Sequence, residues 1–284
     1  MPRDEDKYPE ESGRRRFVKG IVGSAALSSV GAGGAAALDA TTQPSGQGGG
    51  TTTYFGIENI GGPAPRGMPM IPIEITSSGE IQGVPPSTAA EASASGFNGS
   101  GVPYIWEWFQ YCGVQSYAGI GPADNADNLF RASQGTYHWQ NDYEDGAPLT
   151  VDMFSDYQDW GNGIGRSGLG KPGMATWRSQ AEGAQTIPVQ VLRTPAVGKM
   201  VDAQGEYSDI DESVRAFVEG ATAQNVMAWL DKCTHFCCTP GFKADPVSAK
   251  FDAENDVYCP CHQSVYNPFS VVQRNFVAYP RPFE

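Results

Sequence analysis

The sequence predicts a mostly β protein with little helix. Its 284 residues include 35 glycines and 21 prolines, together close to a fifth of the chain, and this favours many turns between short strands. Short apolar runs bounded by turn residues are typical of strands. Apolar residues make up 40% of the chain and aromatic residues 11%, which is enough for a packed core, so disorder of the whole chain is not expected.

The N-terminal region has the features of an export signal. Residues 14–19 (RRRFVK) resemble the twin-arginine signal S/T-R-R-x-F-L-K, with Gly13 and Val18 at the two positions that differ. The twin-arginine route carries proteins that are already folded, often around a cofactor. A cofactor site is therefore expected downstream.

The stretch that follows the basic block predicts a membrane anchor. Residues 20–38 are apolar or small and just suffice to span a bilayer as one helix. We expect 1–38 to remain as a single transmembrane anchor with the basic block inside and the rest of the chain outside. The alternative is cleavage near residues 35–40. Residues 39–53 (DATTQPSGQGGGTTT) are small and polar and predict a flexible linker.

The body of the chain shows strand patterns with one helical pattern. Residues 84–103 are rich in Ala, Ser and Gly and predict a loop, and 121–148 have no clear period. The aromatic segment 104–117 predicts a strand packed on the body, or a surface for a partner. Apolar periodicity predicts a short helix at 209–219 and strands at 70–75, 176–178, 187–193 and 226–230.

The charge balance is acidic. There are 32 Asp and Glu residues against 19 Lys and Arg, a net charge of −13, which argues against nucleic-acid binding. The acidic residues are spread along the whole chain. Solubility or adaptation to high salt explains them, and an acidic docking face for a basic partner is the alternative.

The residues that could carry chemistry gather near the C-terminus. Five of the six cysteines and two of the three histidines lie within residues 233–262. The first block reads C-T-H-F-C-C from Cys233, and the second reads C-P-C-H-Q-S from Cys259. Each block offers a cysteine and a histidine within three residues of each other, which predicts a metal site more than a disulfide framework.

Several other interpretations fit less well. Zinc ribbons use C-x₂-C pairs and c-type haem attachment needs C-x-x-C-H, and neither spacing occurs here. The Gly-rich stretch 163–172 imitates a dinucleotide fingerprint and a P-loop, but no buried strand precedes it and Pro172 interrupts the required helix. We predict a surface loop there. His138 is expected to be a packing or surface residue.

The two blocks resemble the signature C-T-H-x-G-C and C-P-C-H-G-S of Rieske iron–sulfur proteins. This resemblance implies a [2Fe–2S] cluster with Cys233 and Cys259 on one iron and His235 and His262 on the other. It also implies a disulfide between Cys238 and Cys261, which suits an oxidising compartment. The implied fold is a pair of stacked antiparallel sheets. It places a family-specific β and loop region at 54–180 and the Rieske domain at 181–284, with a cluster-binding subdomain at about 229–276.

The resemblance also assigns hydrogen-bond donors to the cluster. Ser264 and Tyr266 stand where the family has hydroxyls that donate to a bridging sulfide and to a cysteine sulfur. Two neutral imidazoles in place of two thiolates lower the negative charge of the cluster, and such proteins have potentials of roughly −150 to +300 mV. The hydroxyl donors raise the potential further.

Two positions and the C-terminal region depart from the family pattern. Cys237 and Gln263 replace glycines, so the loop shapes are expected to differ. The proline-rich third loop of the family has only a loose counterpart at 278–282, and the chain stops at Glu284 without the closing strands. The ligands and the implied disulfide leave Cys112 and Cys237. We predict a second disulfide between them, with two buried free cysteines as the alternative.

The functional expectation is a Rieske subunit of a cytochrome bc-type complex. His262 would contact quinol, and the partners would be a cytochrome b-type membrane subunit and cytochrome c or another high-potential acceptor. The cluster domain would lie on the outer face of the cell membrane. The alternatives are a Rieske subunit of an exported oxidase such as arsenite oxidase, and a non-redox metal-binding module.

Overall fold

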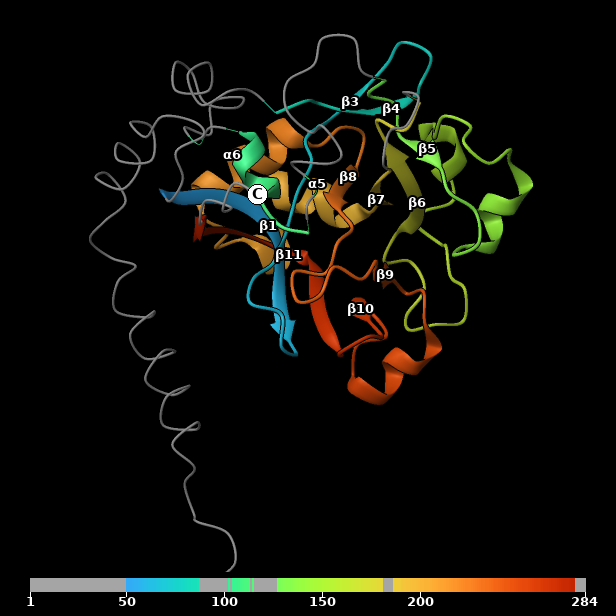
Figure 1. Ribbon diagram of the computed structural model, residues 1–284. Coiled ribbons are helices and arrows are strands. Elements are labelled where there is room, and N and C mark those ends of the chain that lie inside the picture. The colour runs from blue at the N-terminus through green and yellow to red at the C-terminus, as the bar shows by residue number, and fades with distance from the viewer. Residues whose placement is uncertain are drawn as a thin grey trace, which may run out of the picture. The chain divides into compact units, whose positions relative to one another are not determined.

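The structure is a computed structural model that describes residues 50–86, 102, 104–112, 114, 127–180 and 186–278. The predicted signal, anchor and most of the linker lie outside these residues, as does most of the loop predicted at 84–103. The described part is mostly β with antiparallel sheets, as predicted (Figure 1). Within it, no helix is both long and apolar enough to cross a membrane.

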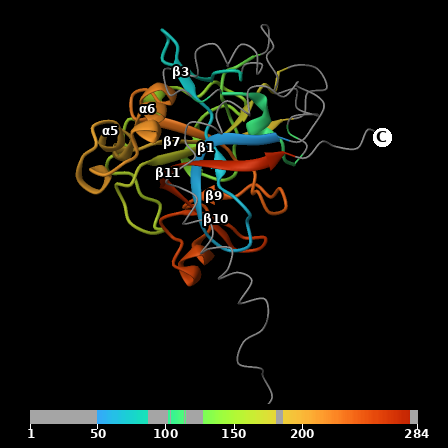
Figure 2. The ribbon, with the colours of Figure 1, turned by 90° about the vertical axis from the view of Figure 1, so that its left-hand side faces the viewer.

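The first sheet joins the two ends of the described chain. Its long central strands, β1 and β11, run antiparallel and lie side by side in Figures 1 and 2. Residues 50–53, which the sequence assigned to the linker, are the start of β1 because their backbone pairs with the last residues of β11. The strand order is β2 (Met68–Pro69), β1 (Gly50–Gly61), β11 (Ser264–Ala278), β10 (Val257–Cys259) and β9 (Gly241–Phe242).

The second sheet carries most of the strands predicted from sequence. Its fully buried edge strand, β8, corresponds to the run predicted at 226–230, and β7 matches the run predicted at 187–193. The boundary expected after residue 180 falls between β6 and β7, which pair along their whole length. The order is β5 (Arg131–Ala132), β6 (Lys171–Trp177), β7 (Ile187–Arg193) and β8 (Val226–Leu230).

A short hairpin completes the β structure. It consists of β3 (Ile73–Ile75) and β4 (Ile81–Gly83) and forms the latter part of the strand predicted at 70–75. An antiparallel bridge between Met70 and Trp229 connects the segment after β2 with β8. The backbone of the first sheet is thereby linked to that of the second.

Two α-helices lie between β7 and β8 in sequence. The helix predicted at 209–219 is α6 (Glu212–Ala221), which starts later because the Asp211 carboxylate caps it by accepting from Ser213 N at 2.8 Å. The other helix, α5 (Pro195–Val201), was not predicted. Thr194 caps α5 and proline occupies its first turn, a pattern typical of helix starts.

The described residues of the aromatic segment, 104–112 and 114, pack on the core, in agreement with the first of the two roles predicted for 104–117. It does not form a strand: Trp106–Phe109 is a 3₁₀ helix, η2. Trp108 is fully buried and its ring centre lies 5.7 Å from that of Phe217 in α6. Phe217 stacks on Phe55 of β1 at 4.2 Å, so β1, η2 and α6 share one aromatic cluster.

Short 3₁₀ helices and loops cover the rest of the described chain. Residues 163–170 of the predicted Gly-rich loop form a largely exposed loop, whereas Lys171 and Pro172, also predicted as loop, begin β6 and are buried. His138 is exposed at the start of a 3₁₀ helix. In both views β9 and β10 lie at one end of the described unit, apart from α5 and α6. The remaining 3₁₀ helices are η3 (His138–Asp142), η4 (Val151–Phe154), η5 (Gly205–Tyr207) and η6 (Pro246–Phe251).

Candidate metal centre

Two tight loops carry the cysteine and histidine blocks. The first lies between β8 and β9, and the second is the turn between β10 and β11. The first loop is closed by Cys237 N donating to Cys233 O at 2.9 Å, and the second by Gln263 N donating to Cys259 O at 2.9 Å. The backbone bonds of each loop therefore hold its cysteine and histidine at fixed separations.

The two positions where the Rieske signature has glycine keep the backbone angles of glycine. Cys237 has φ of 65° and Gln263 has φ of 62°. This left-handed region is unfavourable for residues with a Cβ, which explains why glycine suits these sites. The loops are thus held in shape by contacts that compensate for the strain.

Cys233 and Cys259 are the free cysteines of the described chain, and both thiols are buried. The hydrogen bond between them lowers the pKa of Cys233 to about 5, against the effect of burial and with help from Tyr266. The pKa of Cys259 is raised by the neighbouring Cys233 sulfur and by burial. A bound metal would displace the thiol protons that remain on the pair.

The two histidines of the blocks lie next to each other. Their ring centres are 4.8 Å apart and the rings are perpendicular. His235 is half-buried, and its Nδ1 atom is buried without a hydrogen-bond partner. His262 is exposed, so one imidazole is reachable from solvent while the other faces inward. Phe236 packs against both rings, yet 65% of it is exposed.

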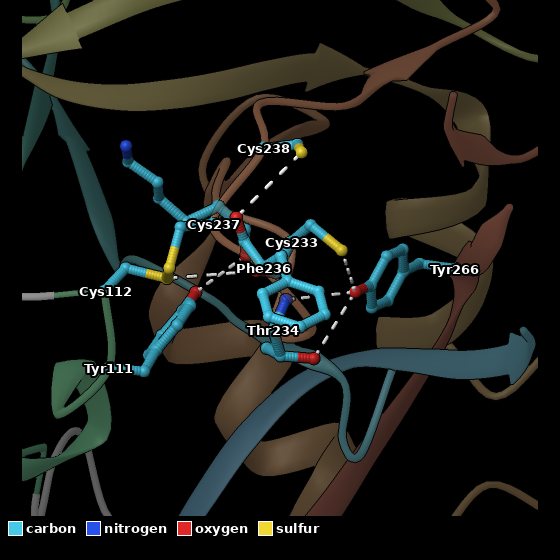
Figure 3. Close-up of a disulfide and its surroundings, with 9 residues drawn as sticks. Tyr111, Cys112, Cys233, Thr234, Phe236, Cys237, Cys238 and Tyr266 are labelled. Atoms are coloured by element: carbon cyan, nitrogen blue, oxygen red, sulfur yellow. Dashed lines mark hydrogen bonds between the residues drawn. A yellow bond between two sulfur atoms is a disulfide. The ribbon is translucent and has the colours of Figure 1, made fainter. Parts of the chain in front are cut away.

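Two hydroxyl groups of β11 point toward the thiol pair. The Tyr266 hydroxyl donates to Cys233 Sγ at 3.2 Å and accepts from Thr234 N at 3.1 Å (Figure 3). The Ser264 hydroxyl is buried and makes no hydrogen bond with any described residue, although its proximity lowers the pKa of Cys233. Ser264 pairs with Cys259 across the strands, so the register of β10 and β11 places it.

Two disulfides anchor the first loop. Cys238 bonds to Cys261, with Cα atoms 6.8 Å apart, and ties the two blocks together as the resemblance implies. Cys237 bonds to Cys112, with Cα atoms 5.4 Å apart, and ties the first block to the segment after η2 (Figure 3). The second disulfide agrees with the predicted pairing and rules out the alternative of two free cysteines.

A three-cysteine metal site is the competing arrangement. The sulfur atoms of Cys238, Cys259 and Cys261 lie within 4.8 Å of one another. Two of these sulfurs are joined in a disulfide, which leaves only Cys259 as a thiolate donor. The set of Cys233, Cys259, His235 and His262 offers more ligands. The unpartnered buried atoms of His235 and Ser264 are also the kind that a bound group satisfies.

A third segment packs over the two loops and was not identified from sequence. It is the turn at 61–67, between β1 and β2, where the backbone at Gly62 has φ of 77°. A Cβ at Gly62 would clash with the Gln263 carbonyl oxygen and with Ser264 Cα. Thr234 Oγ1 donates to Arg66 O at 2.6 Å, so the same turn also holds the first loop.

The proline-rich covering segment expected at 278–282 is described only at Ala278, the last residue of β11, and 279–282 lie outside the described residues. The strand that closes the sheet beside β11 is β1, which precedes the ligand loops in sequence. In the sequence, the Gly-Pro-Ala-Pro run at 62–65 could have indicated a proline-rich turn, although not that this turn lies near the site.

The structure places His235 beside His262, Tyr266 beside Cys233, and Ser264 opposite Cys259. Comparisons with family models, with curated proteins and with solved structures found no match for this chain.

Proposed function

We propose that this chain is a Rieske-type iron–sulfur protein that takes part in quinol oxidation in a cytochrome bc-type complex. The observation that carries the proposal is the convergence of two buried thiols and two adjacent imidazoles on loops joined by a disulfide. A [2Fe–2S] cluster bound there supplies reversible one-electron transfer, at roughly −150 to +300 mV when two imidazoles replace two thiolates.

The chain's own residues suit the two ends of such a site. Cys233 and Cys259 would hold the buried end, where the neighbouring Cys259 thiol and the Tyr266 hydroxyl lower the pKa of Cys233 and favour its thiolate form. His235 and His262 would hold the outer end. The exposed imidazole of His262 can reach a quinol hydroxyl, and the exposed ring of Phe236 beside it offers an apolar contact for the quinol ring.

Tyr266 and Ser264 would tune the reduction potential. A hydroxyl that donates to a ligand sulfur stabilises added negative charge there, so the reduced state is favoured and the potential rises. The Tyr266 hydroxyl already donates to Cys233 Sγ at 3.2 Å. The Ser264 hydroxyl is buried near the same thiol pair, lowers the pKa of Cys233, and can donate to a sulfide or thiolate acceptor. A high potential suits electron uptake from quinol.

The proposed setting is the outer face of a membrane. The twin-arginine-like block and apolar stretch at 1–38 would export and anchor the chain, and the linker would let the head move between a cytochrome b-type subunit and a high-potential acceptor such as cytochrome c. The two disulfides support an oxidising compartment.

The proposal is tested by a redox titration of the purified chain, with electron paramagnetic resonance as the detection method. We expect two iron and two acid-labile sulfide per chain and a rhombic signal on reduction, with a midpoint potential above zero. His262→Gln should abolish the signal, whereas His138→Gln, at the exposed histidine outside the site, should leave it unchanged. Bound zinc without iron would refute the proposal, and a strongly negative midpoint would refute the quinol-oxidising role.

A further inference from the structure

A partly buried arginine lies next to the candidate metal centre without an anionic partner. The guanidinium carbon of Arg66 is 3.8 Å from the ring centre of Phe276, 4.7 Å from that of Tyr111 and 5.1 Å from that of Tyr54. One terminal nitrogen, Nη2, donates to Trp108 O at 3.4 Å. The other, Nη1, is buried and has no hydrogen-bond partner, and no carboxylate of the described residues forms an ion pair with this arginine.

This environment is costly for a positive charge. Cation–π contacts with three rings recover part of the lost hydration, but an unpaired Nη1 atom remains buried. In contrast to Arg66, two arginines form ion pairs with carboxylates: Arg131 with Asp127 and Arg274 with Glu58. The charge of Arg66 is therefore not neutralised by a carboxylate of the described residues, and it lies in a region that screens it poorly.

The arginine contacts Thr234 on one side of Cys233, and Tyr111 links it to Lys232 on the other side. Its carbonyl oxygen accepts from Thr234 Oγ1 at 2.6 Å, and its guanidinium lies over Tyr111, whose hydroxyl donates to Lys232 O at 3.1 Å. The charge also reaches Tyr266, the donor to Cys233 Sγ, since the two side chains influence each other electrostatically.

We infer that Arg66 is an electrostatic tuning residue that raises the reduction potential of the metal centre from behind the Cys233 loop. This inference rests on the proposed function. Reduction adds one negative charge to the site, and a fixed cation in a poorly screening environment stabilises that charge more than the oxidised state. The three aromatic rings hold the cation in place.

The test is a redox titration of the full-length protein carrying Arg66→Met, Arg66→Gln or Arg66→Lys. We expect the two neutral variants to shift the reduction equilibrium at least tenfold toward the oxidised form, which is a fall of ~59 mV for one electron. Arg66→Lys keeps the positive charge, so its midpoint potential should fall less than that of the neutral variants. Arg274→Gln is the matched control, because it removes an exposed arginine that is paired with Glu58, and its midpoint should equal that of the wild type.

The outcomes separate this inference from the proposed function. A wild type without iron would refute the function itself. A wild type with the expected signal, and neutral Arg66 variants with the wild-type midpoint and the same g values, would refute the tuning role alone. If both neutral variants fail to retain iron while Arg66→Lys retains it, Arg66 serves folding instead of tuning, and the inference is overturned.

Discussion

Removal of the Cys112–Cys237 disulfide should cost more stability than removal of Cys238–Cys261. The Cys112–Cys237 bond closes a segment of 125 residues, and the chain-entropy relation gives up to about 5 kcal/mol of unfolding free energy for a loop of this length. The Cys238–Cys261 bond closes 23 residues, which corresponds to about 3 kcal/mol. The longer loop closed by Cys112–Cys237 therefore predicts the larger loss of unfolding free energy.

Alanine pairs are the suitable variants. Cys112→Ala with Cys237→Ala removes the long-range disulfide without leaving a free thiol, and alanine at 237 keeps the left-handed strain that cysteine already carries there. Cys238→Ala with Cys261→Ala removes the other bond. Urea unfolding without reductant, monitored by tryptophan fluorescence, measures the free energy of unfolding of each variant. The reasoning fails if the long-loop variant loses less than about 1 kcal/mol, or if peptide mapping of the wild type finds a free Cys112 thiol.

Three further predictions concern the site and its surroundings. Tyr266→Phe removes the hydroxyl that donates to Cys233 Sγ. It should lower the midpoint potential by roughly 60 mV if the hydrogen bond favours the reduced state by about 1.4 kcal/mol, whereas the control Tyr157→Phe should leave the midpoint unchanged. An unchanged midpoint in Tyr266→Phe would mean that this hydrogen bond does not tune the potential. Gly62→Ala should speed the loss of the visible absorbance in chelator because its Cβ clashes with the second ligand loop, and Gly79→Ala, also at positive φ but with open space around it, should not. Burial, and then the nearby Glu254, raise the pKa of Asp256 to about 6 from 3.8, so the stability that its proton contributes is lost as pH rises through about 6. Asp256→Asn should therefore raise the urea midpoint at neutral pH and change it little at about pH 4; equal effects at both would exclude this cause.

Local sequence signals predicted the parts of the site that lie within single elements. The two Cys and His blocks are contiguous in sequence, so their spacing alone identifies both ligand loops. The strands at 187–193 and 226–230 are apolar runs of strand length, and α6 has a helical period that buries Val214, Phe217, Val218 and Ala221. These patterns involve residues close together in sequence, so they can be recognised without knowledge of the tertiary structure.

The features that sequence reasoning missed depend on contacts between distant segments. The turn at 61–67 precedes Cys233 by more than 150 residues, and only the pairing of β1 with β11 brings it to the ligand loops. The same pairing draws residues 50–53 out of the predicted linker. The 3₁₀ helix η2 was predicted as a strand because aromatic residues favour strands in general, whereas here Trp108 is buried against α6 and β1.

The partner of Cys112 is a mixed case. Counting the cysteines left after the ligands and the implied disulfide gave the correct pair, although nothing in the local sequence links Cys112 to the first block. The aromatic cage around Arg66 could not be found in this way, because its rings come from β1, β11 and the segment after η2. Neither residue spacing nor composition indicates that these rings meet.

The central claim is that two histidines and two cysteines hold one iron–sulfur cluster. The most direct test is electron spin-echo or double-resonance spectroscopy of the reduced protein with ¹⁵N-labelled histidine. We expect two strongly coupled histidine nitrogens, with one lost or altered in His235→Cys and none affected in His138→Gln. A cluster signal without histidine coupling would mean ligation by sulfur alone, and it would contradict the ligand set of Cys233, His235, Cys259 and His262.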